Sequence, residues 1–306
     1  MKELFTMWKN TRMIVLMAVS AALYAAVLIP FKVALPIIPG FTEVRPANVI
    51  PIICSLMFGP AAAWGSAIGN TIGDFFGTLG LGTFFGFIGN FLYGYIPYKM
   101  WQAFGKGEPI FGSRRSATRA WTMALAVSVV IGLVVGLTKG ILYGIGVFLT
   151  VFVCVFLVLM FLSVRYFVLI LSASVACGVF IGWGVHVLGL VPFPALGNII
   201  VINNLLASAV LGPVLLLILY PVVKRMGLLY TDVMEESDLS KSRVWGSALM
   251  IIAVIAGLIV GNWITIGGYE LDALGPGFAQ AVVGRGGLGL GLLPFILLIL
   301  IAAAVM

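Results

Sequence analysis

The sequence has little charge, little histidine and little cysteine, and each shortage excludes a class of protein. Charged residues make up 9% of the 306 residues, whereas a soluble domain usually carries about 25%. The only histidine is His186, which excludes a histidine-rich metal site. The three cysteines, Cys54, Cys154 and Cys177, form no C-x-x-C pair and lie in apolar segments, which favours core packing. The composition therefore argues against a soluble domain and against a metal centre.

The sequence also lacks the motifs of the common enzyme classes. It has no Walker A motif, G-x-x-x-x-G-K-[ST], so we expect that the chain does not itself hydrolyse ATP. It has no H-E-x-x-H, and no catalytic triad or carboxylate pair with convincing placement. The glycines of VVGRGGLGLG, residues 282–291, lack the βαβ context of a dinucleotide site. We therefore expect neither enzymatic activity nor a cofactor.

Long hydrophobic runs dominate what is present. The mean hydropathy is +1.20, and apolar runs of about 20 residues recur along the chain. This pattern predicts an all-α, polytopic transmembrane bundle of about ten helices. We expect a membrane body over residues 1–225, a cytoplasmic linker over 226–243 and a C-terminal helix pair over 244–306. The predicted helices are 12–30, 47–59, 61–78, 83–101, 120–137, 141–163, 166–189, 198–222, 245–265 and 287–305.

The basic residues predict how the chain is oriented in a cell membrane. If both termini are cytoplasmic, most of the 17 Lys and Arg lie inside, as the positive-inside rule requires. Only Lys32, Arg45, Lys139 and Arg285 then fall outside. Topology thus explains the net charge of +7, and a nucleic-acid partner is not expected.

Polar residues within and beside the predicted helices gather in the outer half of the membrane. A polar group in hydrocarbon must be paired or must line a wet cavity. The cluster therefore predicts a pocket that is open to the outside and binds a small solute. The candidate substrate-binding residues are Glu43, Arg45, Asn48, Asn70, Asp74, Asn90, Lys139, Trp183, His186, Asn203 and Asn204.

Several of these residues have a second interpretation. Asn70 and Asp74 are spaced i, i+4 and share a helix face, but Asp74 could instead form a structural bridge with Lys139 or Arg45. Such a bridge could also close over a pocket. Trp183 and His186 could be an interfacial tryptophan and a histidine with satisfied hydrogen bonds.

The first predicted helix carries small residues at a spacing of four. Ala18, Ala22 and Ala26 form one stripe, on which another helix can approach closely. The partner could be a helix of the same chain or a separate membrane subunit.

Two stretches resemble a known family. FTEVRPANVIPIICSLMFGPAAAWGSAIGNTIGDFFGT, residues 41–78, and FFGFIGNFLYGY, residues 84–95, resemble the S components of energy-coupling factor (ECF) vitamin transporters, in the riboflavin-type broad family. GNIIVINNLLASAVLGPVLLLILYPVVK, residues 197–224, resembles the last helix of such proteins.

The resemblance implies a six-helix core to which helices 120–163 and the C-terminal pair are additional. It implies capture of a vitamin or related micronutrient from outside, under the loop 31–46. Ala18, Ala22 and Ala26 would then dock on a T subunit, which works with two cytoplasmic ATPase subunits. The alternative is a self-sufficient secondary carrier with Asp74 as its ion site. The helix count favours this alternative, but no inverted repeat is visible.

Overall fold

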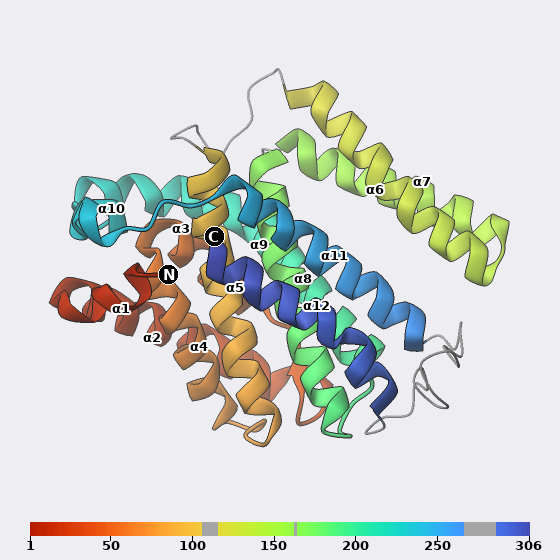
Figure 1. Cartoon of the computed structure of the whole chain (residues 1–306), viewed down its shortest axis with the longest axis horizontal. Helices are drawn as coiled ribbons and strands as arrows, with labels where there is room; N and C mark the ends of the chain where they lie inside the picture. The colour runs from red at the N-terminus through yellow and green to blue at the C-terminus, as the bar shows by residue number, and fades with distance from the viewer. Residues whose placement is uncertain (106–115, 162–163, 266–285) are drawn as a thin grey trace. The chain divides into compact units, whose positions relative to one another are not determined.

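The computed structural model describes residues 1–105, 116–161, 164–265 and 286–306. Its architecture is all-α, as predicted, and each predicted helix has a counterpart in the structure (Figure 1). The long helices are α2 (Thr11–Ala34), α3 (Val49–Phe58), α4 (Pro60–Asp74), α5 (Gly82–Gly105), α6 (Ser116–Lys139), α7 (Ile141–Phe161), α8 (Val164–Val187), α9 (Phe193–Arg225), α11 (Val244–Thr265) and α12 (Gly286–Val305).

Short elements connect these helices. The N-terminus forms α1 (Glu3–Thr6) and the 3₁₀ turn η1 (Met7–Lys9), and a second 3₁₀ turn, η2 (Pro46–Asn48), leads into α3. The predicted linker 226–243 contains α10 (Tyr230–Val233) and η3 (Glu236–Asp238). It is therefore partly ordered into helical turns.

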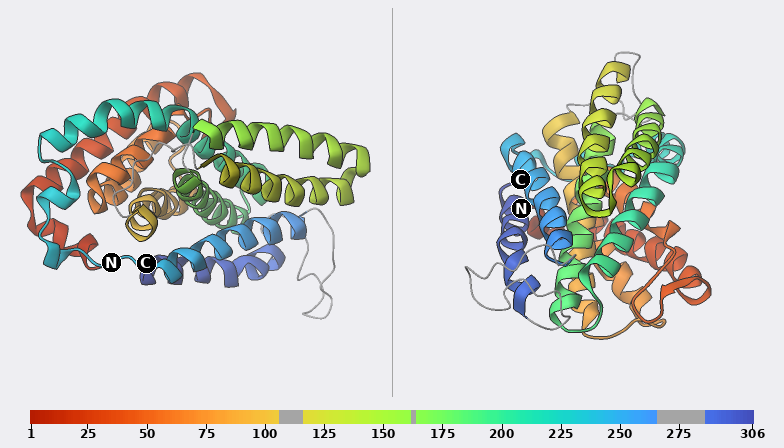
Figure 2. Two further views of the ribbon diagram at one scale, coloured as in Figure 1. Left: turned by 90° about the horizontal axis from the view of Figure 1, so that it is seen from above. Right: turned by 90° about the vertical axis from the view of Figure 1, so that its right-hand side faces the viewer.

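Five of the described helical segments are long and apolar enough to cross a membrane. They are Thr11–Ala34, Val164–Val187, Phe193–Val233, Val244–Thr265 and Gly287–Val305. The protein is thus embedded in a membrane. In Figure 2, α11 and α12 run side by side as a helical pair.

The chain forms two compact units. The larger unit comprises Met1–Lys106 and Leu169–Met306, so the C-terminal pair belongs with the N-terminal helices. The smaller unit, Gly107–Val168, is built on the hairpin of α6 and α7. The two helices of this hairpin contact each other through glycine residues. A methyl group on Gly144 would lie only 2.6 Å from Cα of Gly136.

In the larger unit, α2 and α4 pack with almost no side chain between them. A methyl group added to Gly65 would lie 2.9 Å from the carbonyl oxygen of Met17, and one on Gly69 would lie 2.7 Å from that of Ala21. Glycine at these positions lets the two backbones approach closely. This contact fixes the position of α4, which carries Asn70 and Asp74.

The structure differs from prediction between α2 and α3. Helix α2 continues through Pro30 to Ala34, four residues beyond the predicted end. The rest of the predicted loop contains an antiparallel hairpin of β1 (Pro36–Ile38) and β2 (Thr42–Glu43). Gly40 makes the turn with φ of +80°, which glycine adopts at little cost. We call residues 35–46 the hairpin segment.

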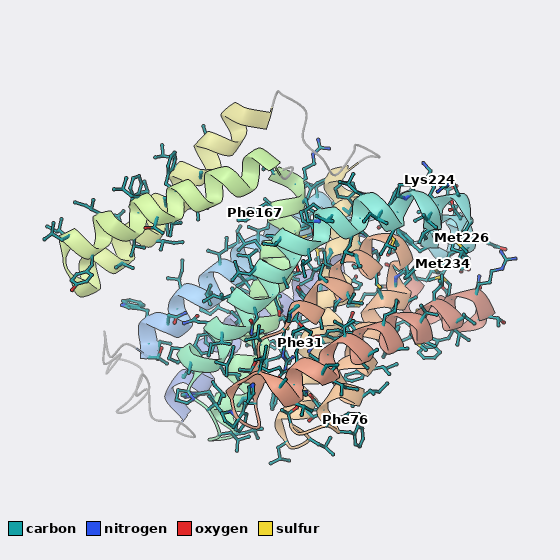
Figure 3. All side chains as sticks on the ribbon, turned by 180° about the vertical axis from the view of Figure 1, so that it is seen from behind. Phe31, Phe76, Phe167, Lys224, Met226 and Met234 are labelled. Atoms are coloured by element: carbon teal, nitrogen blue, oxygen red, sulfur yellow. The ribbon has the colours of Figure 1, made fainter. Side chains whose placement is uncertain are left out.

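The hairpin segment and the linker lie at different ends of the larger unit. Figure 3 shows Lys224 and Met226, at the end of α9, close to Met234 of the linker. Phe76, which follows α4, lies far from these residues in the same view. The polar groups near α4 and those near the linker are therefore separate clusters.

Candidate functional site

A cavity of about 250 Å³ opens beside the hairpin segment in the larger unit. One side of it comes from residues between 40 and 90 and holds all the polar lining residues, together with the apolar Phe41, Leu79 and Leu81. The other side is apolar and comes from α8, α9 and the turn between them. The polar lining residues are Arg45, Asn70, Asp74, Thr78, Thr83 and Asn90. The apolar side consists of Ile181, Val185, Leu190, Leu196 and Ile200.

Asp74 is the carboxylate in the described lining of the cavity, and it accepts several hydrogen bonds. Lys32 Nζ lies 2.5 Å from its Oδ1, and Thr78 Oγ1 donates to the same atom at 2.9 Å. Asn70 Nδ2 donates to Oδ2 at 3.2 Å. The Asp74 side chain is 7% exposed and that of Lys32 is 1% exposed, so this ion pair is buried. The negative charge of Asp74 is therefore matched by a lysine of the same chain.

The partner of Asp74 is Lys32, and the predicted pairing with Arg45 was wrong. Arg45 forms an ion pair with Glu43 instead, with Nε 2.8 Å from Oε1. The other predicted partner, Lys139, is the last residue of α6, and its side chain lies outside the described part of the chain. Lys32 was missed because a helix end at Pro30 would have placed it in a loop.

Arg45 joins the hairpin segment to the wall of the cavity. Its Nη1 donates to Oδ1 of Asn70 at 3.2 Å. On the other side of the hairpin segment, Asn203 Nδ2 of α9 donates to the backbone carbonyl of Glu43 at 2.9 Å. These bonds fasten the hairpin segment to α4 and to α9. Glu43 and Asn203 do this from behind the cavity surface.

A buried hydroxyl lies directly behind Asn90. Tyr24 of α2 has its hydroxyl oxygen 2.8 Å from Asn48 Oδ1 and 3.1 Å from Asn90 Oδ1. A phenol carries one hydrogen, so it can donate fully to only one of these acceptors at a time. Asn90 also donates from Nδ2 to the carbonyl of Gly86 at 2.9 Å. Asn90 Oδ1 therefore shares the single Tyr24 hydrogen with Asn48 and has capacity to accept a further hydrogen bond.

The network continues away from the cavity. Asn48 Nδ2 donates to Oδ1 of Asn204, and the hydroxyl of Tyr93 lies 2.9 Å from the carbonyl of Asn48. Asn48 and Asn204 are both 2% exposed. They support Asn90 from behind and do not line the cavity. Tyr24 was not predicted, although a tyrosine within an apolar helix signals a hydroxyl that needs a partner.

Trp183 and His186 lie near the cavity in sequence but do not line it. Trp183 Nε1 donates to the carbonyl of Gly289 at 2.9 Å, which ties α8 to α12. His186 Nδ1 accepts a hydrogen bond from the backbone N–H of Phe193 at 3.3 Å. This bond joins the end of α8 to the start of α9. In this structure both residues hold helices together.

The alanine stripe of α2 points away from the core of the described chain. Ala18, Ala22 and Ala26 are exposed, whereas Ala21 and Ala25 are each 4% exposed. Ala21 belongs to the face that meets Gly65 and Gly69 of α4. The helix therefore uses one small-residue face for internal packing and leaves the other free.

Comparison with protein families gives a match to part of the chain. A family model described as "QueT transporter" matches residues 14–164. No curated protein and no solved structure matches the chain. The matched range includes every polar residue that lines the cavity, from Arg45 to Asn90.

Proposed function

Residues 14–164 belong to the QueT transporter family, which is a family of ECF S components, and on this premise we propose that the chain is the substrate-binding subunit of an ECF-type importer. It captures a vitamin or related micronutrient from outside. A T subunit and two ATPase subunits then drive its delivery to the inside. The observation that carries this proposal is the cavity, which has a polar and an apolar side within a membrane-embedded bundle.

The two sides of the cavity have different roles in the proposal. The apolar side holds the ring or chain of the solute, while the polar side fixes its orientation. Arg45 is a donor, Asn90 Oδ1 is an acceptor, and the amide of Asn70 lies between Arg45 and Asp74. Because Arg45 is paired with Glu43, and Asp74 with Lys32, the wall selects by hydrogen bonding more than by net charge.

The bonding of Asp74 favours this function over an ion-coupled carrier. An ion site at Asp74 would require a carboxylate that is free to take up a proton or a cation. Asp74 already accepts hydrogen bonds from Lys32, Thr78 and Asn70. A carrier mechanism would have to break the buried Lys32 pair in every cycle, which is costly in a low dielectric.

Native mass spectrometry of the purified chain tests substrate capture. We expect a bound compound of defined mass that leaves on heating, without any need for ATP. Asn90→Ala should lower the bound fraction by tenfold or more, since a lost buried hydrogen bond costs about 1–3 kcal/mol. Asn262→Ala is the matched control, because its amide bonds Asn198 outside the cavity. If both variants retain the compound equally, the binding site lies elsewhere.

The exposed stripe of α2 is the proposed docking surface for the T subunit. We expect Ala22→Leu to retain the bound compound but to abolish ATP-driven uptake and co-purification of the T subunit, because a leucine blocks close helix approach. Ala21→Leu is the contrasting variant, since Ala21 is buried against α4 and should fail to fold. Uptake that follows an ion gradient and needs no T subunit would establish the carrier mechanism instead.

A further inference from the structure

The N-terminal segment, residues 2–12, has two faces of different chemistry. It is helical from α1 through η1, so residues three or four apart share a side. Phe5 and Trp8 lie on one side and are 69% and 43% exposed. Leu4 and Met7 lie on the other side and are buried. Two large aromatic side chains thus project from a segment that precedes a membrane-spanning helix.

The buried side of this segment is fixed to the larger unit. Trp64 Nε1 of α4 donates to the carbonyl of Leu4 at 3.1 Å. On the exposed side, the half-exposed Trp8 ring meets the Trp64 ring edge to face at 5.7 Å. Asn10 accepts from the backbone N–H of Arg12 and of Met13, which caps α2. The exposed side is therefore held in a defined position at the start of α2.

The charge on the exposed side is positive. Lys9 and Arg12 are exposed, and no carboxylate pairs with either of them in the part of the chain that the structure describes. The acidic residue of the segment, Glu3, is buried and paired with Lys99, so it does not oppose an approaching anion. Lys2 donates to the carbonyl of Ser237 and is left out of the surface.

We propose that the N-terminal segment is a docking surface for anionic phospholipid. Phe5 and Trp8 lie at the level of the lipid headgroups, where aromatic side chains of membrane proteins are enriched. Lys9 and Arg12 bind the headgroup phosphates. Two features select this partner: unpaired cations beside exposed aromatics, and a position directly before a span that starts at Thr11.

Lipid retention by purified variants tests the proposal. The full chain is titrated in detergent with phosphatidylglycerol or phosphatidylcholine, and bound lipid is counted by native mass spectrometry. A cation near an anionic surface contributes roughly fivefold in affinity. The double variant Lys9→Gln/Arg12→Gln should therefore bind phosphatidylglycerol between fivefold and roughly 25-fold more weakly, with phosphatidylcholine unchanged. These exposed substitutions should leave the unfolding temperature unaltered.

Matched variants locate the surface. Lys224→Gln/Arg225→Gln removes two cations at the end of α9 and should retain wild-type binding of phosphatidylglycerol. In vesicles that contain brominated phosphatidylglycerol, the brominated lipid should quench a smaller fraction of the tryptophan fluorescence in Trp8→Phe than in the wild type. The proposal is overturned if the α9 variant weakens binding as much as the N-terminal variant. It is also overturned if brominated lipid fails to quench Trp8.

Discussion

The two ends of α2 each lie near a buried lysine–carboxylate pair, but only one of these pairs borders a cavity. At the hairpin segment, Lys32 lies 2.5 Å from Asp74, which lines the candidate site. At the N-terminal end, Lys99 lies 2.9 Å from Glu3, and their side chains are 0% and 1% exposed. The same ion-pair chemistry therefore borders a cavity in one place and forms a closed contact in the other.

The difference lies in what surrounds each carboxylate. Glu3 accepts hydrogen bonds from Lys99 and from Ser240 of the linker, the latter at 2.6 Å. Burial raises the pKa of Glu3, but the Ser240 bond and the Lys99 charge outweigh burial and lower it to about 2. The Glu3–Lys99 cluster thus joins α1, α5 and the linker. Asp74, in contrast, has one side turned toward the cavity.

Breaking the Glu3–Lys99 cluster should have the largest effect on stability. Lys99→Met removes the buried cation from the Glu3 carboxylate and leaves it only the N-terminal ammonium group, 3.3 Å away, which costs about 3–5 kcal/mol of unfolding free energy. Chemical denaturation in detergent measures the change. Lys241→Met is the control, because Lys241 is exposed and should change stability by about 0.5 kcal/mol or less. Equal stability of both variants would show that the cluster is dispensable.

Acid should weaken the same cluster. Glutamate in an unfolded chain has a pKa of about 4.3, whereas Glu3 has a pKa of about 2 in the folded protein. The stabilisation is therefore fully present above about pH 4.3 and is lost as the pH falls through about 2. We expect the unfolding temperature of the wild type to fall over this window more steeply than that of Glu3→Gln.

Breaking the pair at the cavity should cost less. In Lys32→Met, Asp74 keeps the donors Asn70 and Thr78 and can be hydrated from the cavity. We expect a loss of about 1–3 kcal/mol under the same denaturation conditions. A loss of unfolding free energy as large as that of Lys99→Met would mean that water reaches neither pair. The two ion pairs would then not differ in their access to solvent.

The smallest change in stability should come from a methyl group placed in the cavity wall. In Gly86→Ala the new Cβ would lie 3.2 Å from Asn70 Nδ2 and 3.7 Å from Asp74 Oδ2. We expect roughly tenfold weaker retention of the co-purified compound, with stability changed by about 1 kcal/mol or less. Gly146→Ala is the control, because no atom lies within 4 Å of its new methyl group and Gly146 does not line the cavity. Equal retention of the compound by the two variants would show that Gly86 is not part of the binding site.

The sequence predicted the helices well because hydrophobic run length depends on local composition. It placed Asn70, Asp74 and Asn90 at one depth, and the structure brings all three to one cavity. Their role in binding remains a prediction, as does that of Arg45. The boundary at Pro30 was wrong because proline does not end a membrane helix whose freed backbone groups find other partners.

Pairings across long sequence separations could not be predicted. Lys99 and Glu3 are 96 residues apart, and Lys32 and Asp74 are 42 apart. Periodicity gives the face of a helix but not the neighbour that the face meets. Trp183 and His186 show the same limit, because their depth resembles that of a pocket residue while their hydrogen bonds hold helices together.

The division of the cavity into a polar and an apolar side has a consequence for biogenesis. Every charged or amide side chain of its lining lies between residues 45 and 90, and the apolar side lies between residues 181 and 200. Chains leave the ribosome from the N-terminus, and their early segments assemble first. The glycine contact between α2 and α4 allows Lys32 to meet Asp74 before α8 is made. We therefore expect the nascent chain to form the Lys32–Asp74 pair first and to add the apolar side of the cavity last.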